Sequence, residues 1–249
     1  MIANELSSDT SRLSRRKAIA VCVGMFFLYA AILVALLFVL QRFALPYIKA
    51  IPTPRNAPVL WWRVDENAAL VGLSDLIAAL VPVALYCRLQ KRSFVDLGFN
   101  RGGTLVAWLL VAAGEACLVY SNIHSGPIRH VPGALGPYAL IAAAIAAPCA
   151  AFAEEIFFRG FLMEIMRRGG LGVVWQILIS GLLFGWAHVG YAGLDWTAMV
   201  YTAVLGMFWS LVYLLAKRSL WPTIIAHIIN DAIVIPSVYY LMVVMRTSH

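Results

Sequence analysis

Two adjacent glutamates, Glu154 and Glu155, stand inside a long apolar stretch of the chain, and Arg159 follows them. An ionisable side chain at the centre of a bilayer costs roughly 2.5–3.5 kcal/mol, so such groups are expected to have a function and a partner. Glu155 and Arg159 are four residues apart, and we expect them to pair on one face of a helix. Glu154 lies about 100° around that helix, where it can face a different cavity and exchange protons with water.

Two later apolar segments carry a second set of polar groups at the same helical spacing. His188 follows Phe184 by four residues, and Asp231 follows His227 by four. A single histidine in a membrane helix usually bonds to a neighbouring helix. However, the chain has five histidines, and the two that lie in apolar segments both belong to this set. Imidazole and carboxyl groups together can activate water and stabilise an oxyanion, so the set indicates a hydrolase.

These residues form three patterns, E-E-x-x-x-R, F-x-x-x-H and H-x-x-x-[N/D], on successive apolar segments between residues 137 and 235. The patterns resemble those of the CAAX protease and bacteriocin-processing enzyme (CPBP) family, also called Abi or type II CAAX prenyl endopeptidase. The resemblance implies an all-helical intramembrane endopeptidase whose active site lies in a membrane-embedded cavity. It also implies that Glu154 activates a water together with His188, while His227 and residue 231 support the oxyanion.

Asp231 departs from this pattern, because many members of the family carry Asn at that position. An ionised carboxylate would repel a developing oxyanion. Asp231 can serve in two ways: as a neutral carboxyl group that donates a hydrogen bond, or as an acceptor that orients the His227 ring and favours its charged form. The four-residue spacing favours the second arrangement.

The composition indicates an integral multi-pass membrane protein. Hydrophobic residues make up 62% of the 249 residues and charged residues only 12%, whereas soluble domains carry about 25% charged residues. The net charge of +7 comes from short basic clusters between apolar runs, which favours the lipid bilayer rather than nucleic acid as a partner. The four cysteines lie in apolar runs without a C-x-x-C pair and are expected to be small buried hydrophobes.

We predict an all-α fold, a polytopic membrane helix bundle of about seven transmembrane helices. Residues 1–17 are expected to be a disordered cytoplasmic tail, residues 18–249 a membrane-embedded domain, and residues 137–235 its catalytic core. The connection at 41–67 holds several prolines and is expected to be an extended loop. The expected spans are 18–40, 68–87, 104–122, 137–158, 171–189, 194–216 and 222–245.

The distribution of positive charge predicts the orientation. Of the 19 Lys and Arg residues, twelve lie outside the spans on the side of the N-terminus and six on the opposite side. The positive-inside rule therefore predicts a cytoplasmic N-terminus and a C-terminus outside, in the plasma (inner) membrane.

The positions of the two histidines along their apolar segments indicate different depths in the membrane. His188 stands near the end of its segment, whereas His227 lies nine residues after Arg218, near the start of the last one. Their convergence requires strong tilt, a chain that dips into the membrane at 190–193, or projection of the fourth and fifth helices into the cytoplasm.

The resemblance to the CPBP family implies a water activated by glutamate, without an obligatory metal or other cofactor, although ligands on three helices could still converge on an ion. The sequence lacks H-E-x-x-H, the spacing that places two zinc ligands and a base on one helical turn. Zinc is the alternative, and its ligands would then be Glu154, His188 and His227.

Three functions are open at this point. The leading one is an intramembrane endopeptidase that acts on a membrane-associated protein or peptide. The second is a non-catalytic immunity or scaffold protein that binds a peptide toxin, and the third is a proton-coupled transporter. A transporter would use Asp75, Glu115, Glu154 and His188 as a relay, but the chain lacks the evident inverted repeats of many such proteins.

Overall fold

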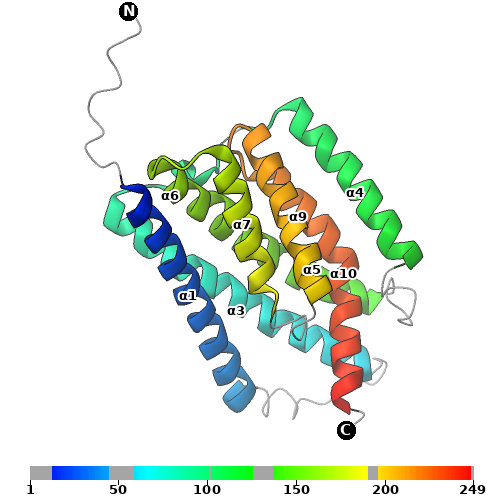
Figure 1. Ribbon diagram of the computed structural model, residues 1–249. Helices are drawn as coiled ribbons and strands as arrows, with labels where there is room; N and C mark the ends of the chain where they lie inside the picture. Colours follow the sequence, from blue (N-terminus) through cyan, green and yellow to red (C-terminus); the bar gives the residue numbers. More distant parts are fainter. Residues whose placement is uncertain (1–12, 45–58, 101, 126–136, 190–195, 248–249) are drawn as a thin grey trace, which may run out of the picture.

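The computed structural model describes residues 13–44, 59–100, 102–125, 137–189 and 196–247. Regular structure within these residues is entirely helical, and each predicted apolar segment coincides with a helix that runs opposite to its predecessor (Figure 1). The predicted all-α bundle is therefore confirmed. Its main helices are α1 (Arg15–Val39), α3 (Val59–Gln90), α4 (Leu105–Ser125), α5 (Pro137–Glu154), α7 (Val173–Ala187), α9 (Trp196–Leu215) and α10 (Trp221–Thr247).

The bundle has the surface of an integral membrane protein. Large apolar side chains point outward from it, such as Phe27, which is 62% exposed, and Leu109, which is 59% exposed. Apolar surface on this scale marks contact with lipid. Four stretches among the described residues are long and apolar enough to cross a membrane, while α7, with 15 residues, is shorter. The four stretches long enough to cross are Arg15–Val39, Leu70–Gln90, Leu105–His124 and Trp196–Leu215. A total of about seven crossings stays a prediction.

Two helices begin at other residues than the sequence predicted. Helix α1 begins at Arg15, where the Ser14 hydroxyl accepts a hydrogen bond from the backbone N–H of Lys17. This N-cap makes the last three residues of the expected tail helical; residues 1–12 lie outside the described residues. Helix α3 begins at Val59, directly after Pro58, so the final part of the predicted extended loop is helical as well.

The helix that carries the double glutamate changes its form at that point. Helix α5 ends at Glu154, a π-helical stretch, η4, covers Glu155–Leu162, and α6 (Met163–Arg168) completes the rod. All eight residues of η4 are buried. Departures from the α-helix of this kind are rare and often occur at functional sites. Helix α6 ends at Gly169, and the next residue, Gly170, has a φ of 71°, which suits glycine.

Aromatic rings hold η4 in the bundle. Tyr29 of α1 stacks on Phe157 with the ring centroids 4.7 Å apart. Phe184 of α7 meets Phe158 edge to face at 5.2 Å. Such contacts stabilise beyond the burial of area alone. The two glutamates are thus anchored to α1 on one side and to α7 on the other.

Glycines bring α7 close to α9. A Cβ atom on Gly185 would lie 2.7 Å from the Ala203 side chain and 2.7 Å from the Met199 carbonyl oxygen. Gly181 is equally confined against Met207. This close approach of small residues, as expected for a G-x-x-x-G pair, sets the position of the end of α7.

We predict that Gly185→Ala lowers stability, because the methyl group must displace backbone as well as side chain. Overpacking of this kind costs roughly 1–3 kcal/mol. Gly172→Ala, at the start of the same helix, is the matched control, since nothing lies within 4 Å of its Cβ position. Thermal unfolding in detergent should show a lower midpoint for Gly185→Ala alone; equal midpoints would contradict close packing here.

The start of α10 is fixed by the connection between α3 and α4. The N–H of Leu220 donates to the Gly98 carbonyl at 3.0 Å, and the Asn100 amide donates to the Arg218 carbonyl at 3.4 Å. Pro222 occupies the first turn of α10, where its missing N–H costs no helical hydrogen bond. These contacts fix the position of the start of α10, and therefore of His227, along the axis of the bundle.

Candidate active site

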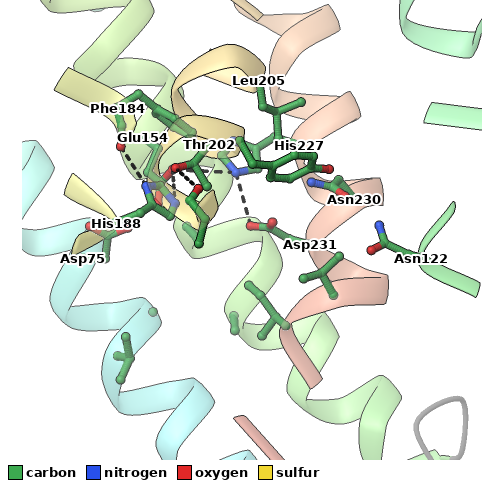
Figure 2. A pocket seen from close by; sticks show the side chains of 18 residues that line it. Asp75, Asn122, Glu154, Phe184, His188, Thr202, Leu205, His227, Asn230 and Asp231 are labelled. Carbon is green, nitrogen blue, oxygen red and sulfur yellow. Dashed lines mark hydrogen bonds and ion pairs between the residues drawn. The ribbon is translucent and has the colours of Figure 1, made fainter. Parts of the chain in front are cut away.

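A cavity of about 490 Å³ lies within the bundle and collects the polar groups of six helices (Figure 2). Four of the six candidate residues line it: Glu154, His188, His227 and Asp231. The other two, Glu155 and Arg159, lie outside its lining and contact it through His227 and Phe184. Further polar lining residues are Asp75, Asn122, Thr202 and Asn230.

Glu154 faces both histidines across short gaps. Its Oε2 atom lies 3.9 Å from His188 Nε2 and 3.7 Å from His227 Nε2, as the dashed lines of Figure 2 mark. That oxygen is buried and has no hydrogen-bond partner among the described residues. The gaps are too long for direct hydrogen bonds but suit one water molecule that bridges the carboxylate and a ring.

His188 caps the short helix α7, and its position explains the F-x-x-x-H spacing. Its Nδ1 lies 2.8 Å from the Phe184 carbonyl oxygen. A carbonyl can only accept, so Nδ1 carries the hydrogen and Nε2 faces the cavity. The ring also packs on Phe184 with centroids 4.7 Å apart. His188 directly follows Ala187, the last residue of α7, and lies level with Glu154. The segment 190–193, where the sequence allowed the chain to dip into the membrane, lies outside the described residues.

Glu155 and Arg159 form the predicted ion pair. Arg159 Nη1 donates to Glu155 Oε1 at 2.9 Å, and both side chains are fully buried. Arg159 Nη2 also donates to the Gly206 carbonyl at 3.2 Å, and its guanidinium lies 4.3 Å from the centroid of the Phe184 ring. These contacts satisfy a buried charge from three directions.

Glu155, rather than Asp231, holds the inner nitrogen of His227. Glu155 Oε1 lies 2.9 Å from Nδ1, while Asp231 Oδ2 lies 3.4 Å from Nε2, the nitrogen that faces Glu154 and the cavity. The arrangement favoured from sequence, with Asp231 as the group that orients the ring, stays a prediction, and Glu155 is a second carboxylate at the ring that the sequence did not assign to it. The four-residue spacing does bring Asp231 beside the ring, but a buried acid on η4 sets the ring's orientation from the opposite side.

Asp75 belongs to the cavity wall, whereas Glu115 does not. Tyr29 donates a hydrogen bond to Asp75 Oδ1 at 2.5 Å, and Asp75 is 4% exposed. Glu115 on α4 is buried, and neither of its oxygens has a hydrogen-bond partner among the described residues. The sequence marked both acids as unusual in their spans, but it gave no sign of Tyr29 as a partner.

Within the described part of the chain, no three His, Cys, Asp or Glu side chains are arranged to hold a metal ion. If zinc binds, Glu154, His188 and His227 are the residues whose oxygen and nitrogen atoms face a common space. The preference for chemistry without a metal stays a prediction.

Comparison with known proteins points to one family. Residues 136–233 match the family model described as type II CAAX prenyl endopeptidase Rce1-like. No curated protein and no solved structure matches the chain significantly. The matched region includes α5, η4, α6, α7, α9 and the part of α10 with His227 and Asp231, so it spans four of the helices that build the cavity. The chain therefore carries a type II CAAX prenyl endopeptidase Rce1-like domain, of an intramembrane CAAX-type protease family, at residues 136–233.

Proposed function

We propose that this protein is an intramembrane endopeptidase that hydrolyses a peptide bond in a membrane-associated protein or peptide. One observation carries the proposal: Glu154 Oε2 is buried, unpaired among the described residues, and within 3.7–3.9 Å of two imidazole nitrogens in a cavity. A carboxylate in this setting is suited to activate a water molecule.

The reaction begins with a water between Glu154 and His188. In the neutral His188 ring, Nδ1–H donates to the Phe184 carbonyl, so Nε2 carries no hydrogen and accepts a hydrogen bond from the water, which orients it. Glu154 takes the other proton as the water oxygen bonds to the substrate carbonyl carbon. The C–N bond then breaks, and the proton on Glu154 passes to the leaving nitrogen. The products are a carboxylic acid and an amine.

His227 is suited to stabilise the oxyanion. Glu155 accepts a hydrogen bond from Nδ1, which favours the imidazolium form and directs Nε2–H toward the cavity. With Arg159 charged as well, the buried trio of Glu155, Arg159 and His227 carries a net charge of +1. A fixed positive charge beside a developing oxyanion is among the strongest contributions to catalysis.

Asp231 is proposed to donate as a neutral carboxyl group, because Glu155 already orients the His227 ring. Asp231→Asn should then keep about half or more of the wild-type turnover, since an amide can also donate, while Asp231→Ala should lose roughly 10²-fold or more. Initial rates of both purified variants across a range of pH check this. A large loss in Asp231→Asn with the fold intact would favour a charged Asp231 instead.

We further predict that metal chelators leave turnover unchanged. Glu154 can act as the base on its own, and the gaps around it accommodate a water. The test is turnover before and after dialysis against a chelator, followed by addition of zinc. Loss of turnover on dialysis and its recovery with zinc would assign Glu154, His188 and His227 as ligands.

A library of quenched fluorescent peptides, incubated with the purified protein in detergent, separates this function from its alternatives. Cleavage supports an endopeptidase, and saturable binding without cleavage indicates an immunity or scaffold protein. Asp75, Glu154 and His188 line one cavity, as a proton-coupled transporter would also require. Proton flux in liposomes without cleavage would therefore favour transport.

A further inference from the structure

The cavity extends farthest from Glu154 in one direction. On α5, its lining continues through Ala150 to Ala146, about 12 Å before Glu154 at 1.5 Å per residue. On α10, it continues to Val234, about 10 Å beyond His227. Helices α3 and α5 begin near the end at which α10 stops (Figure 1). The cavity thus runs from Glu154 toward the side of the bundle where α10 ends.

The opposite side of Glu154 is filled by packed side chains. Phe157, Phe161 and Leu162, which follow Glu154 toward α6, are fully buried. On α10, Thr223 is fully buried and Ile224 is 1% exposed, and both precede His227. A core of native packing density leaves no room for a peptide to pass. The site therefore has no route through the described residues toward the side where α6 lies.

The lining toward the end of α10 has room and an exposed rim. Small residues, such as Gly72, Ala146 and Ala198, form much of it. Tyr201 of α9 also lines the cavity and is 54% exposed, so it stands at the rim. Hydrolysis consumes a water at Glu154, and this opening can admit water as well as substrate.

We propose that water and substrate enter from the side of the membrane at which α10 ends, opposite to the start of α1. This inference rests on the proposed function for its substrate. With the N-terminus in the cytoplasm, as the charge distribution predicts, the entrance lies at the outer face. The substrate class is then a peptide or protein segment at the outer face of the membrane, rather than the end of a cytoplasmic protein.

The test uses a thiol in the cavity and a cationic, membrane-impermeant methanethiosulfonate reagent. A cationic reagent suits a cavity lined by Asp75, Glu154 and Asp231. The four native cysteines are replaced by alanine, and Val234→Cys is introduced with and without Glu154→Gln. Reagent is added to one face of sealed vesicles at a time. Labelling needs no turnover, so the result does not depend on the proposed catalytic activity.

Reference thiols define the two faces and the background. Lys17→Cys marks the side of α1's start and His249→Cys the side of the C-terminus. Val204→Cys, which is 59% exposed on a spanning helix, marks lipid contact and should not be labelled from either face.

We expect reagent on the face that labels His249→Cys to label Val234→Cys. Reagent on the face that labels Lys17→Cys should not label Val234→Cys. Labelling from the face of Lys17→Cys, or from neither face, overturns the proposed entrance. A cytoplasmic position of His249→Cys in cells overturns the assignment to substrates at the outer face. Correct labelling of a protein that cleaves no peptide would instead refute the proposed function alone.

Discussion

Replacing Glu154 with glutamine is expected to lower turnover by about 10²–10⁴-fold while the fold is retained, because the amide cannot take a proton from water. The substitution keeps the size of the side chain, and the Oε2 atom has no hydrogen bond to lose among the described residues. Initial rates with a cleaved peptide, together with thermal unfolding, measure both effects. Glu154→Gln with more than half of the wild-type turnover would refute the assignment.

Glu164→Gln is the matched control for this prediction. Glu164 lies on the same continuous rod, but it pairs with Arg167 at 2.7 Å, away from the cavity. The Arg167 side chain is 52% exposed, so the pair contributes little to stability. Turnover of Glu164→Gln should stay close to that of the wild type.

Arg159→Ala is expected to reduce stability strongly, by roughly 3–5 kcal/mol, because it breaks a fully buried ion pair and leaves Glu155 with His227 as its remaining partner. It also removes the hydrogen bond to the Gly206 carbonyl and the contact with the Phe184 ring. Turnover should fall as well, since Glu155 orients His227. Denaturant or thermal unfolding in detergent measures the change.

Arg167→Ala serves as the control for the arginine, because its ion pair is half exposed and should cost no more than about 1 kcal/mol. Glu155→Gln should resemble Arg159→Ala, since it leaves the guanidinium without its carboxylate. If both variants unfold at the wild-type temperature, the buried pair has no structural role.

Helical spacing predicted much of the site. The four-residue intervals place Glu155 with Arg159 and His188 with Phe184, and the structure contains both contacts. These contacts lie within one helix, so they follow from the pitch of the chain. Apolar length likewise predicted every main helix, because a bilayer core requires about 20 residues to cross it.

Contacts between helices could not be read from spacing. The bond from His227 to Glu155 joins residues 72 positions apart, and that from Tyr29 to Asp75 joins residues 46 apart. Both depend on how η4 and α3 pack against their neighbours. The π-helical form of η4 was also missed, because its sequence is compatible with an ordinary α-helix.

Helix tilt limited the prediction of depth. Glu154 and His188 lie at similar distances along the chain from the turn near Leu171, so helical rise accounts for their common level. The depth of His227 relative to them depends on helix tilt and packing, of which the sequence offers no measure. The side from which the cavity is entered follows from packing, which the sequence alone does not give.

Hydrolysis in water enriched in ¹⁸O tests the proposed chemistry most directly. A single turnover of purified protein on a cleaved peptide is analysed by mass spectrometry of the products and of the protein. Attack by a water activated at Glu154 predicts one ¹⁸O atom in the new carboxyl group of the peptide and none in the Glu154 side chain. Enrichment of Glu154 itself would reveal a covalent acyl intermediate and would contradict the proposed mechanism.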